Sequence, residues 1–378
     1  MAKTVVILGG AFAGLHVAHA LLKKRDAGLK VILVSKNSHF YWNIASVRAI
    51  VPGIYKDEEI FKPISEALSR YPETSYELVV GTAEAADFEA KTVSVTTASS
   101  SEPRSISYDQ LLLATGSRTA VTGVPWKAAG SYEEAVALLH ATAEKAEAAS
   151  HIVVAGAGST GVEVAGELGF AWGKTKEIVL LCAEDKLLGG DIVSSAAANE
   201  LKKLNVRVEY GTRVEDTKPS ESDAKKTDIT VSSTEAKTIT TDLYLPTFGL
   251  VPNSEFIDAK YLEDGARKGL VAVDEFLRVK DTTNVWAAGD LVSNPRAGFM
   301  ITQKQAAAVA KNIELALAGK PPLAAKGMPV DILAVSTGRS RGAGRMGSFR
   351  MPSFGVWLAK GRQLGLNMFP SYLDGSVA

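Results

Sequence analysis

Cysteine is almost absent from this sequence, because Cys182 is the only one among 378 residues. A single thiol excludes an intrachain disulfide, a cysteine metal cluster and a relay of electrons through a cysteine pair. The chain also lacks a net charge, since 42 Lys and Arg balance 42 Asp and Glu. On electrostatic grounds, neither nucleic acid nor an anionic membrane is expected as a main partner, and no metal site is expected.

Long apolar runs are lacking as well, so no segment is expected to span a bilayer. The N-terminal Met-Ala-Lys leads directly into a strand-like run, without the pattern of a signal peptide or the glycine needed for N-myristoylation. We therefore expect a cytoplasmic protein, monomeric or homodimeric, and leave peripheral contact with a membrane open. The length suffices for two or three globular domains.

The strongest pattern lies in the middle of the chain. Ile152–Ala155 is a short β-branched run that is typical of a buried strand, and Gly156-x-Gly158-x-x-Gly161 and a helix-compatible segment follow it. In such a turn the first glycine permits a tight bend, the second lets the backbone approach a pyrophosphate, and the third lets the helix pack closely. A glycine-rich turn can also be a compact connection only, but the full strand–turn–helix context favours nucleotide binding.

A less regular copy of this pattern lies at the N-terminus, and it decides how the function of the whole chain is interpreted. Val5–Leu8 predicts a strand, and a helix is expected to run to about Lys24. Two such turns in one chain predict two bound dinucleotides, one of which can be a flavin. The residues of the first turn are Gly9, Gly10, Ala11, Phe12, Ala13 and Gly14.

Several departures and supporting positions surround the first turn. The next predicted strand ends in Ser35 and Lys36, where an Asp or Glu usually bonds a ribose hydroxyl, so Ser35 offers one hydrogen bond or only ends the strand. The small residues of Thr115-Gly116 let the backbone approach a cofactor at a crossover. Asp290 follows another strand and either accepts a bond from a flavin ribityl hydroxyl or is a simple turn aspartate.

These patterns predict an α/β protein with two Rossmann-like dinucleotide-binding domains. The first predicted domain comprises residues 1–118 and 243–325, and residues 119–242 form the second. Residues 326–378 form a C-terminal segment. The strand that would select the nicotinamide cofactor ends in Cys-Ala-Glu, which leaves NADH and NADPH open.

The chain resembles the apoptosis-inducing-factor-like and ferroptosis suppressor protein family of FAD-dependent NAD(P)H oxidoreductases, which is related to type II NADH dehydrogenases. The paired glycine turns, Ala-Thr-Gly and Ala-Gly-Asp carry the resemblance to the superfamily, and the Asn43…Arg48 spacing and the tail around Lys360 point to this branch. The resemblance implies FAD on the first domain, NADH or NADPH on the second, and a quinone-like acceptor. Carried over by position, the residues that would contact FAD are Gly9–Ala13, Arg48, Ala83 and Asp290.

Our hypothesis is an NAD(P)H:quinone oxidoreductase in which hydride passes to flavin N5 and electrons then pass to the acceptor. Glu163 would orient the nicotinamide, or would merely complement the dipole of its helix. Lys360, which matches a lysine on the quinone side of the flavin, would stabilise developing negative charge. An entrance for the acceptor built from Phe299, Phe354 and Trp357 is an alternative to their being core residues. The other functions considered are a flavin oxidase or monooxygenase acting on a small metabolite, and a redox-sensing flavoprotein.

Overall fold

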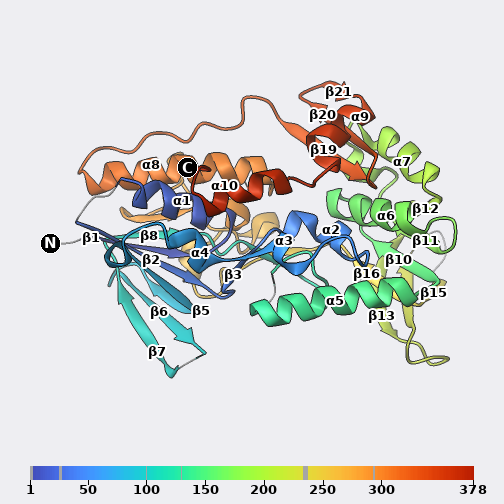
Figure 1. The fold of residues 1–378 in the computed structure, drawn as a ribbon, viewed down its shortest axis with the longest axis horizontal. Coiled ribbons are helices and arrows are strands. Elements are labelled where there is room, and N and C mark those ends of the chain that lie inside the picture. The colour runs from blue at the N-terminus through green and yellow to red at the C-terminus, as the bar shows by residue number, and fades with distance from the viewer. Residues whose placement is uncertain (1–2, 25–27, 99, 129, 233–236, 293) are drawn as a thin grey trace.

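The computed structural model describes residues 3–24, 28–98, 100–128, 130–232, 237–292 and 294–378. Two sheets of mainly parallel strands form the core, and a small C-terminal sheet packs over the helices of the second one (Figure 1). Within the ranges just given, no helix combines the length and the apolar character needed to cross a membrane.

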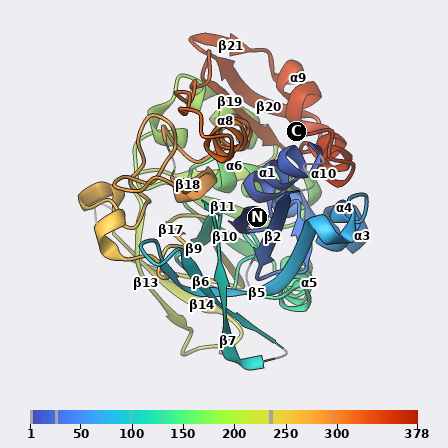
Figure 2. The same ribbon diagram turned by 90° about the vertical axis from the view of Figure 1, so that its left-hand side faces the viewer.

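The first sheet has seven strands, of which five are parallel. Its central residues Val5–Leu8 are at most 1% exposed, as is typical of parallel strands that are covered on both faces. Helices α1 (Phe12–Leu22) and α8 (Phe299–Leu317) pack against each other over this sheet (Figure 2). In spatial order the strands are β18 (Val285–Ala287), β8 (Gln110–Leu113), β1 (Lys3–Leu8), β2 (Leu29–Ser35), β5 (Tyr76–Asp87), β6 (Thr92–Thr97) and β7 (Ser100–Ser107).

Short elements fill the connection between β2 and β5. They are β3 (His39–Tyr41), α2 (Ser46–Ala49), α3 (Asp57–Ile60), β4 (Phe61–Pro63) and α4 (Ile64–Leu68). Strands β3 and β4 pair antiparallel, and this pairing buries the stacked rings of Tyr41 and Phe61. The segment after the second strand is therefore an ordered layer rather than an open loop.

The second sheet has four parallel strands, and an antiparallel three-stranded sheet covers part of one face. Ser131 begins helix α5 with a capping box, because its Oγ accepts from the Glu134 amide while the Glu134 carboxylate accepts from the Ser131 amide. The parallel strands are β12 (Val206–Glu209), β11 (Glu177–Leu181), β10 (His151–Ala155) and β16 (Leu243–Pro246). The helices are α5 (Tyr132–Ala148), α6 (Ser159–Trp172) and α7 (Ser194–Lys203), and the covering strands are β13 (Arg213–Pro219), β14 (Thr227–Ser232) and β15 (Lys237–Thr241).

The chain crosses between the two sheets twice, and the two crossings lie side by side. Strand β9 (Ser117–Thr119) leaves the first sheet and pairs antiparallel with β17 (Leu250–Pro252), which returns to it. Strand β16 still belongs to the second sheet, because Leu243 pairs with Ile152 of β10. The return therefore lies after Pro246, and the boundary expected at residue 243 is corrected by four residues of strand.

The C-terminal segment forms a unit of its own that packs on the second domain. Gly166 of α6 lies so close that a Cβ there would be 2.9 Å from the Cα of Thr337. Residues 337–347, a stretch rich in glycine and arginine, form most of a β-hairpin. The elements are β19 (Ile332–Thr337), β20 (Arg341–Met346), β21 (Phe349–Met351), α9 (Ser353–Val356), a π-helical turn (Trp357–Gly361) and α10 (Phe369–Leu373).

Helix α10 returns to the first domain and lies beside α1 (Figure 2). Buried His19 of α1 contacts the hydroxyl of Tyr71 at 2.9 Å and the carbonyl oxygen of Tyr372 at 2.7 Å. The C-terminal segment thus contacts both nucleotide-type domains.

Candidate functional site

The first glycine turn brings the start of helix α1 very close to two strands of the first sheet. Gly9 has φ +112°, and a Cβ there would lie 2.2 Å from the carbonyl oxygen of Ala114. A Cβ on Gly14 would lie 1.7 Å from the oxygen of Gly9. Helix α1 has no side-chain cap and no acidic residue in its first turn, and Ala11 at its N-cap is exposed. An uncapped N-terminus of this kind fits a pyrophosphate, because its amide groups carry a partial positive charge.

The second glycine turn has the same construction. Gly156 has φ +101°, and a Cβ on Gly161 would lie 1.8 Å from the oxygen of Gly156. Helix α6 begins at Gly158 without a side-chain cap and without acidic residues in its first turn. Around the position of a Cβ on Gly158 there is no atom within 4 Å. The turn is therefore closely packed at Gly156 and Gly161 and open at Gly158, which fits the approach of a second pyrophosphate.

Asp290 lies at the carboxyl edge of the first sheet, just after β18. Its carboxylate accepts a hydrogen bond from Ser117 Oγ at 2.9 Å and pairs with Lys127 Nζ at 2.6 Å. Burial opposes ionisation, but the Lys127 ammonium and these bonds outweigh it and hold the pKa of Asp290 below its usual value. Asp290 is thus an ionised acceptor beside a cavity of about 170 Å³ that Ser117, Leu250 and Arg267 also line. The sequence analysis did not identify Lys127. The only signal for it is that it is the single charged residue between Gly123 and Gly130.

The crossover turn beside Asp290 is fixed by reciprocal hydrogen bonds. Thr115 Oγ1 donates to the carbonyl oxygen of Asn253 at 2.7 Å, and Asn253 Nδ2 donates to the oxygen of Thr115 at 2.9 Å. Gly116 has φ +67° with open space around its Cβ position. The backbone is therefore open at the Cβ position of Gly116, as a close cofactor contact requires.

The other residues that are predicted to contact FAD around the first glycine turn are Ser35, Lys36 and Ala83. Ser35 lies against the turn, since a Cβ on Gly10 would be 2.8 Å from Ser35 Oγ, but that hydroxyl donates to the oxygen of Asn37 at 2.7 Å. Lys36 is exposed, and Ala83 lies in the antiparallel part of β5. Contacts of these residues with FAD stay predictions.

Rings gather around Phe12, at the start of α1. The ring centroids of Phe40, Trp42 and Phe299 lie 5.0, 5.1 and 5.3 Å from that of Phe12. Phe299 and Phe354, which are both predicted to line the acceptor entrance, therefore have different surroundings. Phe299 belongs to this aromatic cluster, whereas Phe354 is 65% exposed.

Glu163 and Lys360, the two residues predicted to be catalytic, form an ion pair. Lys360 Nζ lies 2.7 Å from Glu163 Oε1 and donates to the oxygen of Ala334 at 3.0 Å. The Glu163 carboxylate also accepts from the amide of Ser336 at 2.9 Å. Glu163 lies on helix α6, which follows the second glycine turn, and Lys360 lies in the π-helical turn of the C-terminal segment. This ion pair therefore connects the predicted NAD(P)H site to the C-terminal segment.

Arg48, which is predicted to contact FAD, is buried among protein acceptors. Its Nε donates to Glu167 Oε1 at 2.9 Å, and its Nη2 lies 2.7 Å from the same oxygen. The other N–H groups face the carbonyl oxygens of Gly361 and Arg362 and the hydroxyl of Tyr55. All five donors of a guanidinium are thus directed at protein acceptors, which leaves none for a pyrophosphate in this arrangement.

Glu167, which sequence reasoning missed, is the buried centre of this link. Its side chain is fully buried, and burial raises the pKa of its carboxyl although Arg48 opposes the rise. Its second oxygen lies 3.6 Å from Arg339 Nε of the C-terminal segment. The sequence signal was a glutamate one turn after Glu163, on a helix whose neighbouring residues are apolar. Arg48 and Glu167 therefore join both domains to the C-terminal segment.

Comparison with known proteins agrees with this geometry. The model of the family described as pyridine nucleotide-disulphide oxidoreductase matches residues 3–316. The chain is 39% identical to oxidoreductase ptaL of Pestalotiopsis fici, over 99% of this chain and 100% of that protein. It is 26% identical to ferroptosis suppressor protein 1 of Homo sapiens, over 95% of this chain and 93% of that protein.

A solved structure supports the fold independently. The sulfide:quinone oxidoreductase of Aquifex aeolicus superposes with a TM-score of 0.77 at 18% identity, covering 100% of this chain and 93% of that chain. The predicted fold class and the predicted resemblance are both confirmed, and the cofactors are FAD and NADH or NADPH. The chain belongs to the pyridine nucleotide-disulphide oxidoreductase family and is a flavin-dependent NAD(P)H oxidoreductase, although its single cysteine cannot form a redox disulfide within the chain.

Proposed function

We propose that this protein reduces a small quinone-like acceptor with electrons from NADH or NADPH. The observation that carries the proposal is the ion pair between Glu163 and Lys360, because it joins the helix after the second glycine turn to the C-terminal segment, where the proposal puts the acceptor. The first turn with Asp290 would hold FAD and the second turn would hold NAD(P)H. When bound there, FAD would supply a hydride acceptor at N5 and a route for electrons to the acceptor.

The side chains of the chain have positioning and electrostatic roles in this proposal. Glu163 is held by Lys360 and Ser336, so its carboxylate has a fixed direction, and in the proposal it would orient the nicotinamide. Lys360 places a positive charge where negative charge develops as the acceptor is reduced. Asp290, ionised beside Lys127, would accept from a hydroxyl of the ribityl chain. With no second cysteine in the sequence, electrons leave the flavin without a dithiol intermediate.

The acceptor class does not follow from a name. One solved structure of this fold is called a sulfide:quinone oxidoreductase, and that name applies to that protein. At 18% identity the likeness extends to the fold only, so the acceptor proposed here depends on the placement of Lys360 and on the missing cysteine pair.

The direct test is an anaerobic absorption spectrum followed by stopped-flow reoxidation. We expect a yellow protein that NADH or NADPH bleaches and that a water-soluble quinone reoxidises much faster than air. Fast reoxidation by air with slow reoxidation by quinone would replace the proposal with a flavin oxidase. Negligible turnover with every acceptor, together with a nucleotide-dependent change of oligomer, would replace it with a redox sensor.

Replacing Lys360 with methionine should slow the acceptor half-reaction on the order of 10²-fold, because a positive charge is lost where negative charge develops. Reduction of the flavin by NAD(P)H should change far less. The two half-reactions are measured separately by stopped flow. Lys360→Arg is the matched control, since it keeps the charge and should retain most of the rate. An unchanged reoxidation rate in Lys360→Met would remove this lysine from the reaction.

A further inference from the structure

A short loop after strand β11 borders the second glycine turn. Strands β10 and β11 are parallel neighbours, so the segments that follow them meet at the same edge of the sheet. We call residues 187–190 the β11 loop. The Leu188 amide in this loop donates to the carbonyl oxygen of Ala157, the residue before Gly158, at 2.8 Å. A dinucleotide bound outside the carboxyl ends of these strands would therefore lie alongside the β11 loop as well as the glycine turn.

The backbone of the β11 loop is left-handed over three successive residues. Leu188 has φ 57° and ψ 32°, Gly189 has φ 62° and ψ 30°, and Gly190 has φ 76°. This conformation is unfavourable for leucine, and left-handed residues normally occur singly rather than in runs. Such a run persists only where the surrounding structure fixes it. The shape of the β11 loop therefore depends on contacts from outside the loop.

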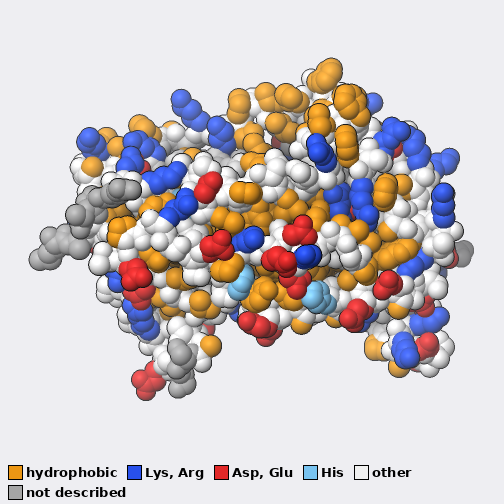
Figure 3. Space-filling model, in the orientation of Figure 1, with side chains coloured by type: hydrophobic (Ala, Val, Ile, Leu, Met, Phe, Trp, Pro, Cys, Tyr) orange, Lys and Arg blue, Asp and Glu red, His pale blue; other side chains and the backbone are white. Residues whose placement is uncertain are grey.

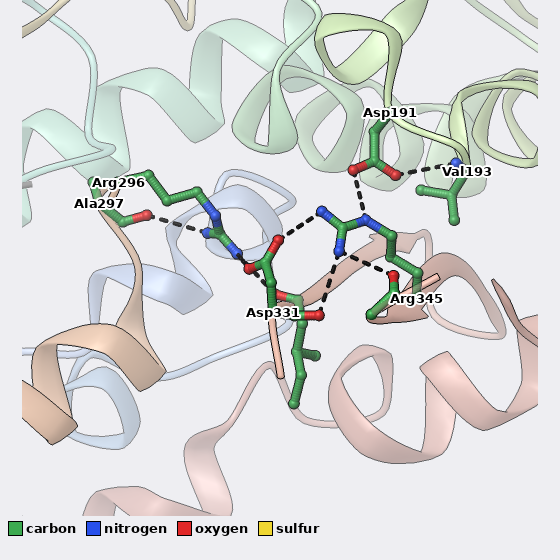
Figure 4. Close-up of polar contacts among 8 residues, drawn as sticks. Asp191, Val193, Arg296, Ala297, Asp331 and Arg345 are labelled. Atoms are coloured by element: carbon green, nitrogen blue, oxygen red, sulfur yellow. Dashed lines mark hydrogen bonds and ion pairs between the residues drawn. The ribbon is translucent and has the colours of Figure 1, made fainter. Parts of the chain in front are cut away.

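Asp191 fixes the C-terminal end of the β11 loop. Its amide donates to the carbonyl oxygen of Leu188 at 3.3 Å, and its Oδ1 accepts from the amide of Val193 at 3.1 Å. Its Oδ2 accepts from Arg345 Nε of strand β20 at 2.7 Å (Figure 4). The first two contacts are local, whereas the contact with Arg345 ties the loop to the C-terminal segment.

The guanidinium of Arg345 is also held from its other side. Its Nη2 lies 2.7 Å from Asp331 Oδ2, and its Nη1 donates to the carbonyl oxygens of Asp331 at 3.3 Å and Gly347 at 3.2 Å. The side chains of Arg345 and Asp191 are 17% and 13% exposed, so their ion pair is largely shielded from water and salt. Arg345 therefore cannot turn away from Asp191 without losing its other bonds.

The C-terminal sheet directs Arg345 toward the second domain. Side chains alternate along a strand, so Arg345 and Met346 point to opposite faces of β20. Met346 is 48% exposed, and Figure 3 shows apolar side chains gathered on the outer side of the sheet, over β20 and β21. Strand β20 also packs against α7, which begins three residues after Asp191. The arginine thus belongs to the contact between the C-terminal segment and the second domain.

We propose that Arg345 is a positioning residue for the nicotinamide nucleotide. Through Asp191 it holds the β11 loop in its left-handed conformation, so that the loop is already shaped when NADH or NADPH binds. Arg345 acts through this loop rather than by touching the nucleotide. The inference rests on the proposed placement of NAD(P)H at the second glycine turn, and it does not depend on the acceptor.

The test measures nucleotide affinity without turnover. The FAD-loaded full chain is titrated by calorimetry with the tetrahydro analogues of NADH and NADPH, which cannot donate a hydride. Arg345→Gln should raise the Kd on the order of tenfold, because part of the binding free energy must then order the loop. Asp191→Asn should raise the Kd by a similar factor. Asp191→Asn/Arg345→Gln should raise it no further, since both single variants remove the same ion pair.

Kinetics separate a positioning role from a purely structural one. Positioning predicts that Arg345→Gln raises the half-saturating concentration of NADH or NADPH in stopped-flow reduction, while the limiting rate of flavin reduction changes far less. A structural role alone would lower the free energy of unfolding in urea and leave the Kd of the folded protein unchanged.

Arg296→Gln is the matched control. Arg296 pairs with the same Asp331 at 2.7 Å, but its side chain is 43% exposed and its other printed bonds go to the carbonyl oxygens of Ala297 and Ile332 (Figure 4). Removing it leaves the pair of Arg345 with Asp191 in place, so the Kd should equal that of the wild type.

The inference is overturned if Arg345→Gln and Asp191→Asn both bind the analogues as tightly as the wild type, or if Arg296→Gln weakens binding as much as they do. Asp191→Asn keeps the shape of its side chain, so it decides the question even if Arg345→Gln does not fold. If Gly158→Val weakens binding and these variants do not, the second turn still holds the nucleotide and the role of Arg345 is wrong. If Gly158→Val has no effect either, the proposed placement of the nucleotide is itself wrong.

Discussion

Gly158→Val should abolish reduction of the flavin by NAD(P)H while the protein stays yellow. No protein atom lies within 4 Å of the position of a Cβ on Gly158, so the new side chain should not disturb the fold. It would instead occupy the space that a pyrophosphate needs at the start of α6. We expect the Kd for NADH or NADPH to rise roughly 100-fold or more, which is about 2.8 kcal/mol of binding free energy. Titration of the flavin spectrum and stopped-flow reduction measure both effects.

Two further glycines provide the controls for this variant. Gly327→Val adds the same side chain at another glycine without neighbours within 4 Å and should leave cofactor binding unchanged. Gly161→Val should prevent folding, because its Cβ would lie 1.8 Å from the oxygen of Gly156. If Gly158→Val loses the flavin but is still reduced by NAD(P)H after FAD is added back, the two domains have the opposite assignment.

Arg48→Met should destabilise the protein strongly without weakening the affinity of the folded protein for FAD. The substitution leaves the Glu167 carboxylate buried, with only the more distant Arg339 nearby, and it removes donors from the carbonyl oxygens of Gly361 and Arg362. Removing one partner of a buried ion pair costs about 3–5 kcal/mol. Urea unfolding with FAD in excess measures the free energy of unfolding, and fluorescence quenching measures FAD affinity.

The partner of Arg48 supplies the matching experiment. In Arg48→Met/Glu167→Leu no charge of this pair remains, so much of the lost stability should return, as happens when apolar residues replace both members of a buried pair. The two single effects should therefore be far from additive. Loss of FAD affinity in Arg48→Met with normal stability would contradict the structural role and restore the interpretation of Arg48 as a pyrophosphate ligand.

Local patterns predicted the parts of the site that neighbouring residues in the chain determine. Gly9 and Gly156 were identified because a left-handed backbone at the end of a strand needs glycine, and both have φ near +100°. The capping box at Ser131 is equally local, since both of its partners lie within three residues. The domain boundary at residue 243 was displaced because a strand's sequence does not reveal the sheet with which it pairs.

The glycines of β20 show the opposite case. Glycine disfavours strands, so the glycine-rich residues 337–347 carry no local signal for a strand. In the structure Gly342 and Gly344 are small because Val356 of α9 lies directly over them. The reason for these two glycines is the packing of a helix that follows later in the chain, so no local pattern of residues could reveal it.

The sequence by itself determined that this protein has two glycine turns for two pyrophosphates and no cysteine pair to relay electrons. Those properties depend on backbone conformation and composition, which a short stretch of residues specifies. Only the tertiary structure decided that Lys360 pairs with Glu163, and that Arg48 pairs with Glu167. Each of these pairs joins segments far apart in the chain, and a buried charge takes whichever partner the packing of the whole molecule brings within reach.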